Sequence, residues 1–309
     1  MTTSPYAAQM AAITVREHRG SVLGHSTAWW EYGSDAPSGT CPVAVFIHGF
    51  RGDHHGLEPI VAQFPDWRII VPDLPGFGKT SPQLSQDIEG YVGWLVAFLR
   101  TAGVVDHGTE PSVAVPVTLL GHSFGSIVVA ATVAAGLSPE HLILINPIVV
   151  SALEGPRGIL TRLAVWYYQL AAGLPERAGL ALLKNSTIVR IMSGIMAKTR
   201  DRKVRAWIHD QHDRYFSHFH DRRAVLAAFQ TSVQHTVTEY ADRITVPTLL
   251  IAGGRDDITP LAAHTAYVAA HPNAQLRVIP EVGHLIHYES PREAAIAIRE
   301  FIGSARPSG

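Results

Sequence analysis

One serine stands in a context typical of an enzyme nucleophile. Ser123 is the central residue of the pentapeptide GHSFG at Gly121–Gly125, which follows the apolar run Val115–Leu120 and precedes the small-residue run Ser126–Ala135. This order predicts a strand, a sharp turn and a helix, with the serine in the turn. Such a turn strains its central residue, and the flanking glycines remove the Cβ atoms that would clash across it. We therefore expect the Ser123 hydroxyl to stand exposed above a sheet, as a nucleophile.

A serine hydroxyl needs a base within hydrogen-bond reach, and that base needs an acceptor on its other ring nitrogen. His284 is the best candidate base, because it follows Gly283 in the loop after the last predicted strand. The acceptor should come from the loop after Val246–Ala252, where Asp256 and Asp257 are adjacent. Only one of these two carboxylates can point at the histidine.

Acyl transfer also develops negative charge on a carbonyl oxygen, which backbone N–H groups stabilise. Phe124 follows the nucleophile at the start of the predicted helix, where its N–H and the helix dipole both favour an anion. Its backbone is therefore a candidate for the oxyanion hole. His48 and His122 lie beside these groups and are expected to brace loops.

The composition of the chain limits which kinds of partner it can bind and where it is expected to be found. The 309 residues include 25 Lys and Arg against 26 Asp and Glu, so no net field holds nucleic acid or an anionic membrane by charge. The single cysteine, Cys41, excludes an internal disulfide and fits a reducing compartment. No signal sequence or membrane span is recognisable. We expect a cytoplasmic protein with a small-molecule substrate and no nucleic-acid partner, and a homodimer stays open.

Seventeen histidines raise the question of a metal site. No His-Glu-x-x-His helix is present. The pairs His54-His55 and His218-x-His220 are expected to point apart, and neither has a carboxylate set that would complete a metal site. The sequence therefore predicts neither a metal nor a cofactor.

Apolar runs alternate with helical segments along most of the chain. After an opening hairpin, buried parallel strands are expected at 43–47, 68–71, 115–120 and 142–145, with helices at 57–64, 88–101 and 126–135. From about residue 148 to residue 243 no strand pattern appears, and the alternation resumes at 246–252. This order predicts an α/β core made of residues 1–147 and 244–309, with a helical cap inserted at 148–243.

Five motifs together resemble a known family. They are His48-Gly49-Phe50, the segment Asp73–Gly78, the serine pentapeptide, Gly254–Asp257 and Gly283-His284. From Val43 to Ile302 the chain is similar to cap-bearing serine hydrolases of the α/β-hydrolase fold. The resemblance implies a mostly parallel sheet flanked by helices. It also assigns the Phe50 backbone to the oxyanion hole, and its Gly-x-x-Asp loop pattern favours Asp257 over Asp256 as the acid.

The expected cap carries much apolar surface, and Trp166, Tyr167 and Met192 are the residues we expect to bind substrate. An apolar or aromatic acyl group is favoured, so ester hydrolysis is the first interpretation. Carbon-carbon hydrolysis of a vinylogous diketone is the second, although Leu285 stands where those relatives usually carry tryptophan. A third alternative is a ligand receptor on the same fold, since one fold hosts many functions.

Overall fold

A sheet of mostly buried strands forms the centre of the molecule. The computed structural model describes residues 2–33, 41–83, 85–108, 113–151, 158–219 and 221–305. Among these residues eight strands form one sheet in the order β1-β2-β4-β3-β5-β6-β7-β8. The strands are β1 (Val15–Val22), β2 (His25–Gly33), β3 (Val43–Ile47), β4 (Arg68–Pro72), β5 (Val117–His122), β6 (His141–Ile145), β7 (Thr248–Gly253) and β8 (Ala274–Ile279).

The sheet is mostly parallel. Strands β1 and β2 form an antiparallel hairpin, and β2 pairs antiparallel with β4. All pairings from β4 through β3, β5, β6 and β7 to β8 are parallel. Every residue of β3, β5, β6 and β7 is buried. Because the carboxyl ends of parallel strands share one edge, the loops that follow β3, β5 and β7 meet there.

Helices cover both faces of the sheet. Along β3, Val43, Val45 and Ile47 pack in one apolar cluster, and Ala44 and Phe46 pack in the other, as the two-residue period of a strand requires. The first cluster includes residues of α3 (Ile88–Thr101), α4 (Phe124–Ala134) and α10 (Leu261–Ala270). The second includes residues of α2 (Glu58–Val61), α11 (Ile286–Glu289) and α12 (Pro291–Ala305). A short helix, α1 (Ala7–Ala11), precedes the hairpin.

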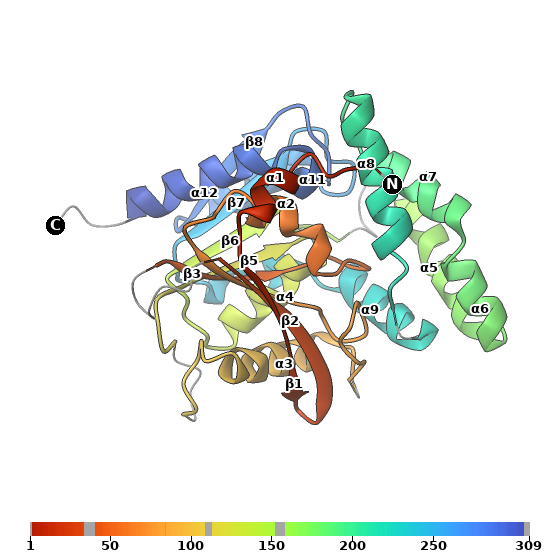
Figure 1. The fold of residues 1–309 in the computed structure, drawn as a ribbon, viewed down its shortest axis with the longest axis horizontal. Coiled ribbons are helices and arrows are strands. Elements are labelled where there is room, and N and C mark those ends of the chain that lie inside the picture. Colours follow the sequence, from red (N-terminus) through yellow and green to blue (C-terminus); the bar gives the residue numbers. More distant parts are fainter. Residues whose placement is uncertain are drawn as a thin grey trace.

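Five helices lie between β6 and β7 in the chain. They are α5 (Gly158–Gly173), α6 (Glu176–Leu183), α7 (Ser186–Met196), α8 (Arg202–Tyr215) and α9 (Arg222–Gln234). Helices α5 to α8 stand together at the right of Figure 1, beside the sheet. Side-chain caps fix the first turns of the last three, because Asn185, Asp201 and Asp221 each accept backbone N–H groups there. A 3-10 helix, η2 (Val237–Arg243), leads back to β7.

The predicted fold class is confirmed by this sheet and its flanking helices. One expected element is different: the helix expected at 57–64 contains only the short α2, and a 3-10 turn, η1 (His54–Gly56), comes before it. Asp53 caps that turn by accepting the His55 N–H, so the chain enters the segment in tight 3-10 geometry. None of the described helices is both long and apolar enough to cross a membrane.

Candidate active site

The sharp turn between β5 and α4 has the strain expected of it. Ser123 has φ 52° and ψ −118°, a backbone conformation that residues other than glycine rarely adopt. A Cβ on Gly121 would lie 2.4 Å from the Gly125 carbonyl oxygen, and a Cβ on Gly125 would lie 2.4 Å from the Ile47 oxygen. Only glycine fits at either position, and this close packing holds the serine at the carboxyl edge of the sheet.

Three side chains from three loops meet at this edge. His284 Nε2 lies 2.8 Å from Ser123 Oγ, and His284 Nδ1 lies 2.8 Å from Asp256 Oδ2. The Asp256 carboxylate has no exposed surface, and 5% of the His284 side chain is exposed. If Nδ1–H donates to the carboxylate, Nε2 is left free to accept the serine proton.

The aspartate is held as an ionised acceptor. Its Oδ1 accepts the Ile258 N–H at 2.7 Å, and its Oδ2 accepts the Asn146 Nδ2–H at 2.8 Å. Burial by itself would raise the pKa of Asp256, but the charge of His284 and these hydrogen bonds outweigh it, so the pKa stays below its ordinary value. The carboxylate is therefore charged where it faces the histidine.

The choice of Asp257 over Asp256 has to be corrected. Asp257 does not face the imidazole: its carboxylate pairs with Lys198 Nζ at 2.5 Å. The physical reason lies in the backbone, because the N–H groups of Ile258 and Thr259 both donate to Asp256 Oδ1 and form a tight turn on that side chain. This turn directs Asp256 inward and its neighbour toward the α7–α8 connection.

Asn146 is a site residue that the sequence reasoning missed. It follows β6 with φ 44°, is completely buried, and donates to Gly283 O at 3.3 Å as well as to Asp256. It therefore fixes both the Asp256 carboxylate and the loop before His284. A polar residue directly after a fully apolar strand, next to the strand of the nucleophile, was the available signal.

The two proposed oxyanion donors come from the start of α4 and from the loop after β3. Phe124 is the first residue of α4, a position whose N–H has no acceptor within the helix. Phe50 belongs to the loop after β3 and lines the same cavity as the serine. His48 braces that loop: its Nδ1 lies 2.8 Å from Gly49 O, and its Nε2 accepts the Leu74 N–H at 2.8 Å.

The cavity above Ser123 has a volume of about 210 Å³ and is lined mostly by apolar and aromatic side chains. Of the three residues expected to bind substrate, Met192 lines it. Trp166 is instead 62% exposed, and Tyr167 donates its hydroxyl to Leu182 O. Ala164 and Tyr168 line the cavity from α5, because positions four apart share one helix face, and residue 166 lies on the opposite face.

Arg51 joins the loop of Phe50 to the inserted helices. Its side chain is buried, and its backbone has φ 58°. The guanidinium donates to Phe216 O at 3.0 Å, Leu183 O at 2.8 Å and the Tyr168 hydroxyl at 3.3 Å. Leu183 ends α6 and Phe216 follows α8, so this cation meets carbonyl groups at the negative ends of two helices.

Two histidines expected to point apart lie together. The rings of His54 and His55 are 3.8 Å apart, and ligand atoms of both lie within 4.8 Å of a carboxylate oxygen of Asp53. The expectation was wrong because the 3-10 turn and its Asp53 cap gather these side chains. Each ring already has a carboxylate partner, since His54 Nδ1 lies 2.9 Å from Asp73 and His55 Nδ1 lies 3.2 Å from Asp53. His220 of the second pair lies outside the described residues.

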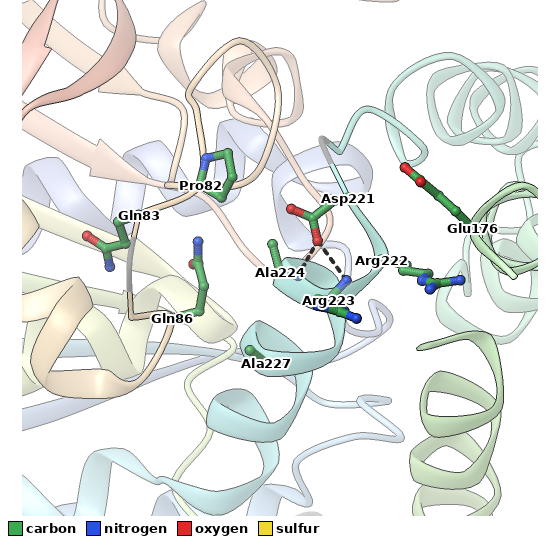
Figure 2. A pocket seen from close by; sticks show the side chains of 9 residues that line it. All are labelled: Pro82, Gln83, Gln86, Glu176, Asp221, Arg222, Arg223, Ala224 and Ala227. Carbon is green, nitrogen blue, oxygen red and sulfur yellow. Dashed lines mark hydrogen bonds between the residues drawn. The ribbon is translucent and has the colours of Figure 1, made fainter. Parts of the chain in front are cut away.

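A second cavity, of about 580 Å³, lies where the loop before α3 faces α6 and α9 (Figure 2). Its lining combines charged and amide side chains with Pro82 and two alanines, and Asp221 caps α9 there by accepting the N–H groups of Arg223 and Ala224. The cavity includes none of Ser123, His284 and Asp256. We therefore assign the chemistry to the smaller cavity.

Two known enzymes are similar to this chain over most of its length. The chain is 27% identical over 271 residues to a pyrrolizixenacetamide deacetylase of Xenorhabdus hominickii, which covers 85% of this chain and 92% of the relative. It is 24% identical to a 2-hydroxy-6-oxononadienedioate/2-hydroxy-6-oxononatrienedioate hydrolase of Cupriavidus pinatubonensis, over 83% of this chain and 82% of the relative.

Solved structures share the fold. A thermophilic esterase from Thermogutta terrifontis superposes with a TM-score of 0.69 at 21% identity, over 94% of this chain and 100% of the esterase. The model of the Alpha/beta hydrolase family matches residues 44–298, which include the serine turn, the Asp256 loop and His284. Because this match spans most of the chain and both halves of the sheet, the protein belongs to the alpha/beta hydrolase family.

Proposed function

We propose that this protein is a serine hydrolase that cleaves carboxylic esters with apolar or aromatic acyl groups. The observation that carries the proposal is the line of contacts from Ser123 Oγ to His284 and on to Asp256, each 2.8 Å long. Helices α5–α9, within residues 148–243, would act as a cap over the core formed by 1–147 and 244–309. Met192 on α7 would contact the acyl group.

In the proposed reaction, His284 Nε2 accepts the proton of Ser123 as Oγ attacks the ester carbonyl. The Asp256 carboxylate keeps Nδ1 protonated and stabilises the imidazolium that forms. His284 then gives its proton to the leaving alcohol, and an acyl-enzyme on Ser123 remains. Water, deprotonated by the same imidazole, attacks the acyl group and releases the carboxylic acid.

The tetrahedral intermediates carry a negative oxygen. We assign its stabilisation to the backbone N–H groups of Phe124 and Phe50, and the first also has the N-terminal dipole of α4 behind it. Bracing by His48 supports the second donor, because it ties the Phe50 loop to the segment after β4. Removing one such donor typically slows an enzyme by about 10²-fold to 10³-fold.

The volume of the cavity favours a short acyl group. Its volume of about 210 Å³ is below the roughly 300–1,000 Å³ of pockets that hold drug-sized ligands. Met192, Met196 and Phe229 supply an apolar wall. We therefore expect short and medium acyl chains to react faster than long ones. The deacetylase relative, whose name describes removal of an acetyl group, supports this expectation.

A panel of nitrophenyl esters from acetate to laurate tests the proposal. The unaltered protein should cleave the shorter members, and Ser123→Ala should lower kcat by about 10⁴-fold or more. Ser186→Ala is the matched control, because Ser186 is an exposed serine at the start of α7. A Ser123→Ala variant that keeps a tenth of the rate would exclude the serine mechanism.

Carbon-carbon hydrolysis is a second candidate, favoured by the likeness to the Cupriavidus hydrolase. The nucleophile, base and acid would be the same residues. This function would be selected if the protein cleaved a vinylogous diketone but did not turn over nitrophenyl esters. Loss of the visible absorbance of the diketone measures its cleavage. A protein that binds such compounds without cleaving either class would instead be a ligand receptor.

A further inference from the structure

Exposed apolar side chains gather on two of the inserted helices. Among the described residues, ten large hydrophobic side chains are exposed, and half of them lie on α5 and α7. We name these five the α5/α7 collar: Leu163, Trp166, Leu170, Ile191 and Ile195. Trp166 is 62% exposed and Ile191 is 58% exposed, so each presents most of its side chain to the surroundings of the molecule. Such a concentration of exposed apolar groups commonly marks an interaction surface.

The two helices of the collar also line the catalytic cavity. Helix α5 contributes Ala164 and Tyr168 to the cavity lining, and α7 contributes Met192 and Met196. On α5 the collar residues lie on the helix face turned away from Ala164 and Tyr168, whereas on α7 Ile191 and Ile195 lie beside the face of Met192 and Met196. Both helices are among those at the right of Figure 1. Ile258, which is 39% exposed, also lines the cavity. The two collar helices therefore carry exposed apolar side chains on one face and cavity-lining side chains on another.

Charge is distributed unevenly around this surface. Residues 158–234 contain twelve Lys and Arg against five Asp and Glu, a formal charge of +7, although the whole chain carries −1. The remainder of the protein is therefore net negative by 8. Arg162 is exposed beside Leu163, and Arg177 is exposed on α6, which packs against α5. The net charge of the chain conceals this local positive region.

We propose that the α5/α7 collar docks on the surface of an anionic lipid bilayer. The combination of exposed Trp, Leu and Ile with surrounding Lys and Arg is what an interfacial contact requires: apolar groups enter the headgroup region, and each nearby cation gains attraction to acidic lipids. The contact is peripheral and needs no spanning helix.

A lipid surface fits better than a second copy of this chain. A two-fold dimer through the collar would bring the two +7 segments together, and like charges across an interface oppose association. A bilayer rich in acidic lipids has the complementary charge. The inference concerns binding alone, so its outcome is independent of whether Ser123 cleaves esters.

Flotation with vesicles tests the proposal without substrate. We expect the unaltered protein to bind vesicles of equimolar phosphatidylcholine and phosphatidylglycerol at low salt, and to bind pure phosphatidylcholine at least about tenfold more weakly. Salt at about 0.5 M should release much of the bound protein, because it screens surface charge. Two double variants separate the apolar and the electrostatic contributions to vesicle binding. The first removes apolar contact by Leu163→Ser with Ile191→Ser, and the second reverses charge by Arg162→Glu with Arg177→Glu. Each should weaken binding about tenfold or more.

Ile296→Ser is the matched control, since Ile296 is a 47% exposed residue on α12. It should bind vesicles as the unaltered protein does. Circular dichroism of each variant checks that it is folded. Absence of binding to acidic vesicles overturns the proposal, and so does binding that neither pair of substitutions weakens. A different outcome would assign the collar to an interface between copies of this chain. In that case the unaltered protein would sediment as a dimer and bind no vesicles, and the double variant Leu163→Ser with Ile191→Ser would sediment as a monomer.

Discussion

Two adjacent carboxylates in the loop after β7 have opposite surroundings. Asp256 is held by His284, Asn146 and backbone N–H groups, and its pKa is kept low despite burial. Asp257 pairs with Lys198 at the edge of the inserted helices. The same residue type therefore has two roles, which are set by the direction in which the backbone turns each side chain.

The pair offers a test with a built-in control. Asp256→Asn should lower kcat for a nitrophenyl ester by about 10³-fold to 10⁴-fold, because the amide no longer selects the required tautomer of His284. Asp257→Asn should change kcat by less than tenfold. Equal losses in both variants, or a larger loss in the second, would return the assignment to Asp257.

At this scale the sequence predicted that Ser123 and His284 meet, but it paired the histidine with the wrong one of two adjacent aspartates. Ser123 and His284 stand beside glycines that permit sharp turns of the backbone, so their directions can be inferred. The direction of Asp256 depends on hydrogen bonds from Ile258, Thr259 and Asn146, and the last of these is distant in the chain. Trp166 and Tyr167 were misassigned because composition does not say which face of α5 borders the cavity.

Among the elements, the turn between β5 and α4 leaves little space for side chains. Gly125 packs against the backbone at the end of β3, where the Ile47 and His48 oxygens would lie 2.4 and 2.6 Å from an added Cβ. Backbone atoms cannot move aside as a flexible side chain can. The junction of β3, β5 and α4 therefore leaves no room for a side chain at residue 125.

We predict that Gly125→Ala lowers the free energy of unfolding by about 3 kcal/mol or more, since strain of this kind forces shifts in a packed core. Gly93→Ala is the control: residue 93 lies within α3, and nothing approaches within 4 Å of an added Cβ. That substitution should stabilise the protein by about 0.5–1 kcal/mol. Urea titration of both variants measures the difference, and a neutral Gly125→Ala would contradict the packing argument.

The elements themselves were largely predictable where one periodicity dominates. The strand at 43–47 and the helix at 88–101 have the predicted bounds, because the first is uniformly apolar and the second has a capping Asp87 and an apolar face. The segment after β3 was not predictable, since its 3-10 turn depends on Asp53 and on contacts with distant residues. Short segments with competing local hydrogen bonds carry little periodic signal.

The molecule as a whole buries several uncharged histidines. Burial, together with the charge of His284, lowers the pKa of His122 to about 3, and burial with the neighbouring His209 lowers the pKa of His212 to about 3. Burial and the nearby His122 also lower the pKa of His287 well below its usual 6.5. The unfolded chain can bind protons at these residues from about pH 6.5 downward, and the folded protein cannot.

Stability should therefore be complete above about pH 7 and fall as the pH drops toward 3. Near pH 5 each such histidine should cost about 2 kcal/mol of unfolding free energy. Urea titrations across this range measure the slope. His212→Gln should make the decline shallower, whereas the exposed His107 provides a control, and His107→Gln should leave the slope unchanged. A slope that His212→Gln does not alter would show that His212 titrates alike in both states.

Covalent labelling tests the central claim most directly, namely that Ser123 is an activated nucleophile. A fluorophosphonate reacts with a serine oxygen and releases fluoride, provided that a neighbouring base removes the serine proton. Mass spectrometry of the labelled, digested protein should find one adduct per chain, on Ser123, and the label should be lost in His284→Ala. An adduct on another residue, or ester cleavage by a protein whose Ser123 stays unlabelled, would contradict the account.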